Sequence, residues 1–331
     1  PDPFLDPETA MPRPKVFVAR RIPAAGLDPI LAACDVDVWP DRLPPAPEVL
    51  REKVAGCDGL VSLLTDRVDA ALLAAAPTLK VVSNFAVGVN NIDLPACTAR
   101  GVKVGNTPGV LTDATADIAV TLLLAAARRL GESSADAKAG RWLTWEPLGW
   151  LGRELAGKTL GVVGMGRIGF ATAKRLHHGW GMRVIYTART PKPDADRDLS
   201  ATRVDLDALL ADSDFVTVHA DLNDSTRGLF GAAAFAKMKP TAVFVNTSRG
   251  PLVDQPALAN ALRTGTIFAA GLDVTDPEPL PPTHELYALP NCVIAPHVAS
   301  ATVETRDAMA RKCAANLLAG VRGEPLPDPV N

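Results

Sequence analysis

The stretch that decides the fold of this chain is Thr159-Leu160-Gly161-Val162-Val163-Gly164-Met165-Gly166-Arg167-Ile168-Gly169. Its first five residues predict a buried strand, and residues 170–176, which follow the stretch, predict a helix. The glycines between them have the spacing G-x-G-x-x-G, in which the first permits a tight turn, the second lets the backbone approach a pyrophosphate, and the third lets the helix pack close to the strand. A glycine turn with a purely structural role is the alternative. The strand before the turn and the helix after it favour a dinucleotide site, with the anion at the helix N-terminus.

Short β-branched segments alternate with Ala- and Leu-rich segments on both sides of this turn, which is the pattern of parallel sheets covered by helices on both faces. The predicted strands around the turn are residues 159–163, 183–186, 215–219, 242–246, 269–274 and 292–295. Six such strands are typical of a dinucleotide-binding sheet. A second, N-terminal group of strands is predicted at residues 15–20, 36–39, 59–64, 81–84 and 102–105. A chain of 331 residues is long enough for two such domains.

Two long helices are predicted outside these strands. The first begins at Thr112 and contains the strong helix formers 116–130, and either Thr112 or Asp113 is expected to cap its N-terminus. The second, residues 302–322, is expected to be amphipathic and to fold back on the N-terminal domain, which would make that domain discontinuous.

A Trp-rich segment follows the first of these helices. Residues 141–151 contain Trp142, Trp145, Trp150 and Pro147, so they cannot form a regular helix. The three indoles either pack within a surface loop or are covered by a partner subunit or a substrate.

The strand after the glycine turn ends without the acidic residue that is typical of NAD sites. In such sites an Asp or Glu about 20 residues after the turn accepts hydrogen bonds from the ribose. Here the strand ends in Tyr186-Thr187-Ala188-Arg189-Thr190, and no carboxylate appears before Asp194. Arg189, Thr190 and Lys192 offer donors where a 2′-phosphate would lie. A solvated basic turn is the alternative, but the missing acid and the added Arg both favour NADP.

Three further motifs lie at predicted strand ends, where the ligands of doubly wound sheets bind. They are Asn246–Gly250, Gly271–Pro279 and Pro296–Thr302. Each alone has an ordinary explanation, because an Arg in a turn is usually solvated and a single His is more often structural than catalytic. Their order and spacing, with the glycine turn before them and Asn84–Asp93 further upstream, resemble the D-2-hydroxyacid dehydrogenases over most of residues 60–325. Residues 110–117, 142–147 and 317–325 resemble more narrowly the glyoxylate/hydroxypyruvate reductase branch.

The resemblance implies that Arg249 grips the substrate, that His297 is the acid/base and that Glu278 is its partner. Chemistry supports these roles independently. Hydride delivery to a ketone builds negative charge on oxygen, and an imidazolium can donate a proton to it near neutral pH. A carboxylate beside the ring favours the charged form and fixes which nitrogen faces the substrate. A guanidinium binds a substrate carboxylate in a planar, permanently charged clamp.

The resemblance also implies the remaining binding residues. The pyrophosphate is expected at Gly166, Arg167 and Ile168, the 2′-phosphate at Arg189 to Lys192, the adenine near Ala220 and Asp221, and the nicotinamide near Thr247 and Asp273. The complete set expected to bind the cofactor is Thr112, Gly164, Gly166, Arg167, Ile168, Gly169, Arg189, Thr190, Pro191, Lys192, Ala220, Asp221, Thr247, Asp273 and Ala299. The set expected to bind the substrate is Leu64, Val87, Gly88, Trp145 and Ser300, with Val87 and Gly88 acting through their backbone N–H groups.

Two departures from the family pattern accompany this match. Ala220-Asp221-Leu222 lacks the Pro that many members have before the Leu, which would alter the adenine pocket. Ala299 stands where Gly is frequent after the catalytic His, which would narrow the nicotinamide side. Neither departure removes a reacting group. Trp145 resembles an indole that reaches the active site of a neighbouring subunit and limits substrate size, which implies a homodimer.

The predicted fold is therefore α/β, with two doubly wound parallel-sheet domains. A Rossmann cofactor domain, residues 109–297, is inserted in a flavodoxin-like substrate domain formed by residues 11–108 and 298–331. Residues 1–10 contain three acidic residues and no apolar signal-peptide segment. We expect them to be an artificial remnant, with Met11 as the natural start.

Composition excludes several classes of partner. Lys and Arg number 34 against 37 Asp and Glu, so a net charge of −3 provides no basic field for nucleic acid or anionic lipid. No apolar run approaches the length of a membrane helix. The five cysteines are widely spaced without a C-x-x-C pair, which suggests neither disulfides nor a metal site and indicates a reducing, cytoplasmic location.

Other functions stay open at the level of sequence. Some relatives of the family are cofactor-sensing transcriptional corepressors, although the absence of long disordered tails favours an enzyme. Among enzymes, a reductase of glyoxylate or hydroxypyruvate is favoured, with NADPH favoured over NADH as the cofactor. Dehydrogenation of phosphoglycerate, D-lactate or phosphite is the alternative.

Overall fold

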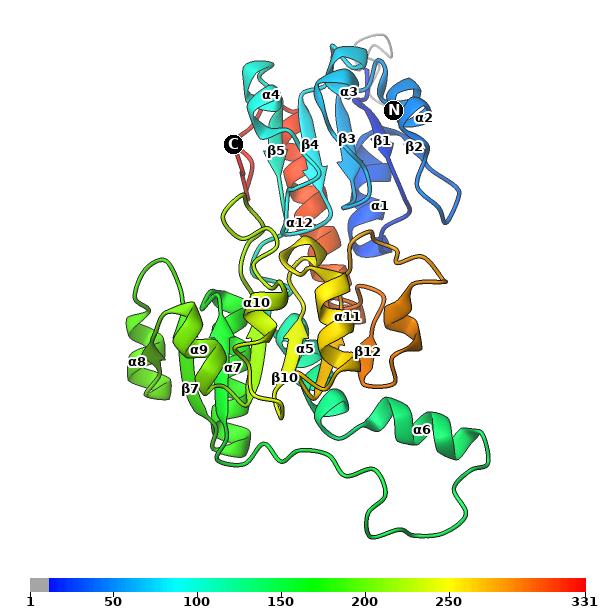
Figure 1. Cartoon of the computed structure of the whole chain (residues 1–331). Helices are drawn as coiled ribbons and strands as arrows, with labels where there is room; N and C mark the ends of the chain where they lie inside the picture. The colour runs from blue at the N-terminus through cyan, green and yellow to red at the C-terminus, as the bar shows by residue number, and fades with distance from the viewer. Residues whose placement is uncertain (1–11) are drawn as a thin grey trace, which may run out of the picture. The chain divides into compact units, whose positions relative to one another are not determined.

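The computed structural model describes residues 12–331 (Figure 1). The chain divides into two compact units, one comprising the described residues up to Val110 together with Thr302–Asn331, and the other Leu111–Ala301. The predicted break points, 108/109 and 297/298, differ from these by two and four residues. The predicted remnant 1–10 and the start at Met11 lie outside the described residues.

The first unit contains a five-stranded parallel sheet of order β2-β1-β3-β4-β5. This is the flavodoxin-like order. The strands are β1 (Lys15–Val18), β2 (Asp35–Val38), β3 (Gly59–Ser62), β4 (Val81–Asn84) and β5 (Lys103–Gly105). The helices are α1 (Ala24–Ala33), α2 (Pro47–Val54), α3 (Ala70–Ala75), α4 (Leu94–Ala99) and α12 (Val303–Val321).

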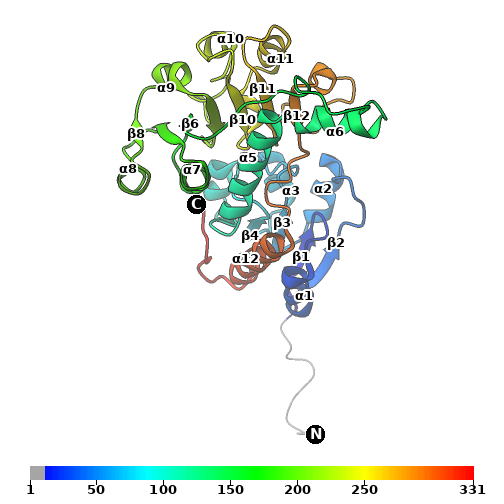
Figure 2. The ribbon, with the colours of Figure 1, turned by 90° about the horizontal axis from the view of Figure 1, so that it is seen from below.

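Helix α12 packs on the sheet of the first unit, although more than 190 residues separate it from β5 (Figures 1 and 2). Thr302 caps its N-terminus by accepting a hydrogen bond from Thr305 N–H at 3.1 Å. A Cβ on Gly26 in α1 would lie 2.2 Å from the carbonyl oxygen of Ala310, so only glycine allows α1 and α12 to approach this closely. Ser83 of β4 also donates to the carbonyl oxygen of Cys313 at 2.8 Å.

The second unit contains a seven-stranded parallel sheet of order β12-β11-β10-β9-β6-β7-β8. From β8 to β11 this is the Rossmann order, with β12 added at one edge. The strands are β6 (Thr159–Val163), β7 (Arg183–Thr187), β8 (Thr202–Arg203), β9 (Phe215–Val218), β10 (Val243–Asn246), β11 (Ala269–Leu272) and β12 (Cys292–Ile294).

Helices cover both faces of this sheet, so each face has its own apolar core. Helices α5 (Thr112–Ala127), α7 (Arg167–Trp180) and α8 (Pro193–Leu199) pack on one face. The opposite face is covered by α9 (Leu206–Asp212), α10 (Ala232–Phe235) and α11 (Gln255–Arg263). Helix α6 (Leu130–Lys138) and the 3₁₀ turns η2 (Gly250–Leu252) and η3 (Glu285–Ala288) complete the unit. Two doubly wound parallel sheets confirm the predicted fold class.

Several sequence predictions about individual elements are wrong. The second sheet has a seventh strand, β8, whose two residues are exposed at the sheet edge and carry no apolar pattern. Neither Thr112 nor Asp113 caps α5, because Leu111 occupies the N-cap position and Asp113 instead pairs with Arg175 of α7 at 2.9 Å. The helix also ends at Ala127 rather than continuing to Leu130.

The early end of α5 follows from the backbone of Arg129, whose φ of 52° is left-handed. Its guanidinium pairs with Glu132 at 2.6 Å and lies 5.0 Å from the ring centroid of Trp150. The chain therefore turns there and restarts as α6. Among residues 12–331, no helix combines the length and the apolar character needed to cross a lipid bilayer.

Candidate active site

The glycine turn follows β6 as predicted and leads into α7. Gly164 has φ 95°, and a Cβ there would lie 2.6 Å from the backbone nitrogen of Ala220. A Cβ on Gly169 would lie 2.2 Å from the carbonyl oxygen of Gly164, so the third glycine lets the helix start against the turn. A Cβ on Gly166 would meet nothing within 4 Å. The N-terminus of α7, with Arg167 and Ile168, thus begins beside open space at Gly166, and the N–H groups of a helix N-terminus favour an anion.

The turn lies at the point where the strand order of the sheet reverses. Strand β6 is flanked by β7 on one side and by β9 on the other, and the loop with Ala220 and Asp221 follows β9. Ligands of open α/β sheets bind at this switch point, outside the carboxyl ends of the strands.

The strands β10, β11 and β12 are neighbours whose carboxyl ends are in register, with Asn246 opposite Leu272 and Leu272 opposite Ile294. The predicted residues that follow these ends are therefore brought to one edge of the sheet. They are Thr247 and Arg249 after β10, Asp273 and Glu278 after β11, and His297, Ala299 and Ser300 after β12.

The hydroxyl of Thr247 is buried and has no hydrogen-bond partner among the residues that the structure describes. A buried hydroxyl without a partner is costly, so it indicates a ligand that supplies one. The position of Thr247 near a nicotinamide stays a prediction. Thr112, which is also expected to bind the cofactor, does not follow a strand of this sheet but is the first residue of α5.

His297 and Glu278 are in direct contact, with Nδ1 of the ring bonded to Oε1 of the carboxylate. The backbone of His297 is left-handed, with φ 52°, which non-glycine residues adopt rarely. Because Nδ1 faces the carboxylate, Nε2 is the nitrogen left to face a reactant.

Asp273 fixes the backbone on both sides of this histidine. Its carbonyl oxygen accepts from His297 N–H at 3.0 Å, and its carboxylate accepts from the N–H groups of Val298 at 2.8 Å and Ala299 at 3.0 Å. Burial raises the pKa of Asp273, while the hydrogen bonds from Val298 and Ala299 oppose that change. The buried carboxylate is thus an anchor for the loop that carries His297.

Arg249 lies close enough to Glu278 for their charges to interact. Its Nη1 donates to the carbonyl oxygen of Ser248 at 2.6 Å. Burial lowers the pKa of its guanidinium, and the carboxylates of Glu278 and Asp221 raise it. The structure therefore brings together the contact between His297 and Glu278 and the largely buried guanidinium of Arg249, three side chains that the sequence predicted to lie at one site.

The predicted basic turn, Arg189, Thr190, Pro191 and Lys192, follows β7 next to the glycine turn. A hydrogen bond from Gly164 N–H to the carbonyl oxygen of Thr187, at 3.0 Å, joins the glycine turn to the end of β7. Within the described part of the chain, neither Arg189 nor Lys192 forms a side-chain ion pair. Their charges remain available for a phosphate.

The predicted substrate residues Leu64, Val87 and Gly88 lie in the first unit, after β3 and β4. Asn106 Nδ2 donates to the carbonyl oxygen of Val87 at 2.8 Å, and Asn84 Nδ2 to that of Gly88 at 2.9 Å. The N–H groups of Val87 and Gly88 have no acceptor among residues 12–331. A loop whose carbonyls are fixed and whose N–H groups are unpaired can bind a carboxylate.

Comparison with known proteins agrees with this arrangement. The family described as D-isomer specific 2-hydroxyacid dehydrogenase, NAD binding domain, matches residues 120–299. A glyoxylate reductase of Korarchaeum cryptofilum is 48% identical over 320 residues, which cover 96% of this chain and 96% of the relative. The chain belongs to the D-isomer specific 2-hydroxyacid dehydrogenases. This dehydrogenase is therefore a nicotinamide-dependent enzyme that reduces a 2-keto acid to a hydroxy acid.

Solved structures extend the comparison. The TT0316 protein of Thermus thermophilus has a TM-score of 0.90 and 47% identity to the dehydrogenase, covering 96% of this chain and 100% of that one. An NADPH-dependent glyoxylate/hydroxypyruvate reductase of Sinorhizobium meliloti, solved with NADP and malonate, has a TM-score of 0.83 and 33% identity, covering 96% and 97%.

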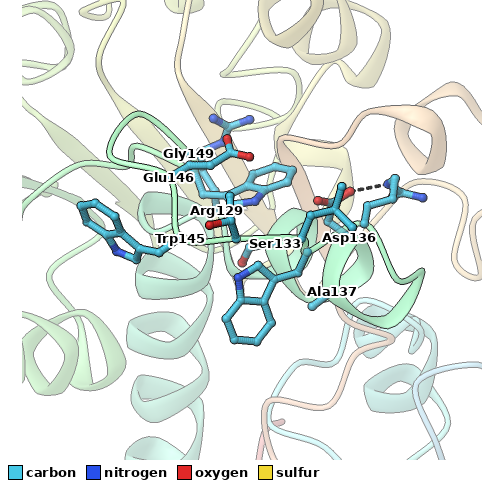
Figure 3. A pocket seen from close by; sticks show the side chains of 12 residues that line it. Arg129, Ser133, Asp136, Ala137, Trp145, Glu146 and Gly149 are labelled. Atoms are coloured by element: carbon cyan, nitrogen blue, oxygen red, sulfur yellow. Dashed lines mark hydrogen bonds and ion pairs between the residues drawn. The ribbon is translucent and has the colours of Figure 1, made fainter.

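Trp145, the last predicted substrate residue, lies in an arm of the dehydrogenase formed by α6 and residues 139–152. Figure 3 shows side chains of α6 and of the following loop around a pocket of about 560 Å³, with the ion pair between Asp136 and Arg141 at one side. The side chain of Trp145 is 80% exposed. The large apolar side chains exposed along this arm are Leu130, Trp142, Leu143, Trp145, Leu148, Trp150 and Leu151. Trp142 and Trp145 are therefore not packed within a surface loop, whereas the half-exposed ring of Trp150 lies against Arg129.

Gln255 was not among the predicted residues, although its buried side chain holds the loop of the dehydrogenase that leads to Glu278. Its Oε1 accepts from Asp276 N–H at 2.9 Å, and its Nε2 donates to the carbonyl oxygen of Asp276. A glutamine next to a helix start carries no motif, so the only signal for this contact is three-dimensional.

Proposed function

We propose that the enzyme reduces glyoxylate or hydroxypyruvate to the D-2-hydroxy acid with NADPH. The observation that carries the proposal is the contact between His297 and Glu278 at the edge of the sheet where Arg249 also lies. The bound nicotinamide would supply the hydride to the keto carbon.

His297 would supply the proton. Glu278 accepts from Nδ1 and stabilises the imidazolium, so that Nε2 carries the proton that the developing alkoxide needs. The left-handed backbone of His297, anchored by Asp273, keeps the ring in this orientation. Arg249 would bind the substrate carboxylate and polarise the carbonyl.

In the first unit, the unpaired N–H groups of Val87 and Gly88 would bind a carboxylate. Leu64 and Ser300 would contact the remainder of a small substrate, and Trp145 would limit its size. The preference for glyoxylate or hydroxypyruvate is supported by the names of the two relatives described above.

The test is the rate of glyoxylate reduction in a His297→Ala variant. General acid catalysis contributes about 10²–10⁴-fold, and we expect a loss of kcat in that range. His178→Ala, which removes an exposed histidine of α7, is the matched control and should keep the parent rate. Full activity of His297→Ala would refute the assignment of the proton donor.

Substrate identity is tested by initial rates with glyoxylate, hydroxypyruvate, pyruvate and phosphite. Glyoxylate or hydroxypyruvate should give the highest kcat/KM. A higher kcat/KM for pyruvate would refute this proposal in favour of D-lactate dehydrogenation. A higher kcat/KM for phosphite oxidation would refute it in favour of phosphite dehydrogenation.

The preference for NADPH is supported by the basic turn. Arg189 to Lys192 stand where a ribose carboxylate partner would be in an NAD enzyme, and their charges are not paired. Replacing Arg189 with Asp should lower the preference for NADPH over NADH. An unchanged preference would contradict this assignment.

We also propose a homodimer formed through the arm around Trp145. Large apolar side chains exposed over so short a segment are unusual for a monomer and support an association surface. Sedimentation of the parent enzyme should give the mass of a dimer, and a Leu143→Glu, Leu148→Glu variant should give that of a monomer. A monomeric parent enzyme would refute the dimer. The cytoplasmic location expected from the cysteines stays a prediction.

A further inference from the structure

The basic turn after β7 accepts structural support from Tyr186, whose hydroxyl is hydrogen-bonded to the backbone of Lys192 and which has no part in the proposed chemistry. Tyr186 is fully buried, and its ring packs in the core between the sheet and α7 and α8. Its hydroxyl reaches the far end of the turn, where it accepts from Lys192 N–H at 2.9 Å and donates to Asp196 at 2.9 Å. The position of Lys192 is therefore tied to the sheet.

Arg203 holds the near end of the same turn. It lies in β8 directly opposite Tyr186 of β7. Its Nε donates to the carbonyl oxygen of Ala188 at 3.0 Å, and its Nη2 to that of Arg189 at 3.2 Å. Arg203 uses its donors on backbone carbonyls, so it orients the turn.

Between the contacts made by Arg203 and those made by Tyr186, the backbone of the turn forms no regular secondary structure. Residues 188–192 belong to no helix or strand, and Arg189 and Thr190 are exposed. A loop that must become ordered when a ligand binds loses affinity through conformational entropy. Ties at both ends remove much of that cost before binding.

We propose that Tyr186 and Arg203 are positioning residues that determine cofactor specificity, because together they present Arg189 and Lys192 to the 2′-phosphate of NADPH. The inference rests on the proposed binding of NADPH at this turn. NADH lacks the 2′-phosphate, so its binding does not depend on the order of the turn.

The first test is direct binding of ligands to Tyr186→Phe, which keeps the buried ring and removes both hydrogen bonds of the hydroxyl. The Kd of NADPH and that of adenosine 2′,5′-bisphosphate, measured by titration calorimetry without turnover, should each rise about fivefold, or about 1 kcal/mol at 25 °C. The Kd of NADH and that of adenosine 5′-monophosphate should be unchanged. Tyr287→Phe, at the other tyrosine of the chain, is the matched control because its side chain is exposed.

The second test is Arg203→Lys, at an exposed position where folding is not in question. Lysine keeps the positive charge and loses the paired contacts with the two carbonyls. The Kd of NADPH should again rise about fivefold. If lysine kept the parent affinity, Arg203 would act through charge alone and its positioning role would be refuted.

Two results would overturn the proposal as a whole. An equal rise in the Kd of NADH and NADPH in Tyr186→Phe would mean that the tyrosine supports the fold alone, and unchanged NADPH binding would mean that it supports nothing at the turn. The Arg189→Asp variant separates this failure from failure of the proposed function. If Arg189→Asp weakens NADPH binding and Tyr186→Phe does not, only the present inference is wrong.

Discussion

A methyl group at position 250 should disable the enzyme, because the structure leaves no room for it. Gly250 follows Arg249, and a Cβ there would lie 1.9 Å from the carbonyl oxygen of Thr275 and 2.1 Å from its carbonyl carbon. Ordinary contacts of a Cβ begin near 3.4 Å, so the two backbone segments must separate by about 1.5 Å. One segment carries Arg249 and the other leads to Glu278. A displacement of about 1 Å among catalytic groups can cost about 100-fold in rate.

The assay is kcat/KM for glyoxylate with NADPH in Gly250→Ala, together with thermal unfolding. We expect a loss of about 100-fold in kcat/KM and a loss of about 1–3 kcal/mol in stability from overpacking. The second unit has a size at which each kcal/mol lowers Tm by roughly 2–4 °C.

Gly179→Ala is the matched control for this substitution. Gly179 lies in α7, and a Cβ there meets nothing within 4 Å. Alanine should therefore raise stability by about 0.5–1 kcal/mol and leave the activity unchanged. If Gly250→Ala kept the activity of the parent enzyme, the close packing of the Arg249 turn against Thr275 would not matter for catalysis.

Three further substitutions or modifications test other parts of the structure. Gln255→Met removes two hydrogen bonds to Asp276 and should lower the free energy of unfolding in urea by about 1–3 kcal/mol, with a lower kcat; an unchanged urea midpoint would contradict this. Gly26→Ala forces α1 away from α12 and should cost the first unit about 3 kcal/mol, seen in calorimetry as a lower Tm of one transition; an unshifted Tm would show that the helices can separate freely. Burial raises the pKa of Cys313 to about 12 and that of Cys97 to about 11, so iodoacetamide at pH 8 should label them only in urea; rapid labelling of the native enzyme would show that these thiols are accessible.

Features that depend on neighbouring residues could be predicted from the sequence. The glycine turn and the strands around it are encoded locally, and so is the absence of an acid after β7. The placement of Arg249, Glu278 and His297 at one edge of the sheet was also predictable, because parallel strands bring their carboxyl ends to one edge and each residue follows a strand end. Their roles are those that the family resemblance implies.

Features that depend on distant residues could not be predicted in the same way. Asp113 has the chemistry of a cap, yet Arg175, 62 residues later, binds it instead. Gln255 meets Asp276 only because the start of α11 and the loop after β11 are brought together by the fold. Strand β8 has no apolar pattern, since it is defined by hydrogen bonds to β7 at an exposed edge.

The return of α12 to the first sheet has a consequence for the order in which the protein acquires its structure during translation. A ribosome that has made residues 12–301 has already synthesised every residue of the second unit, which can fold as an uninterrupted segment once it has left the exit tunnel. The first sheet still lacks the helix against which Gly59 and Val81 pack. Its uncovered apolar face would be a binding surface for chaperones until the last helix leaves the exit tunnel. The part of the chain that is synthesised first is therefore completed last.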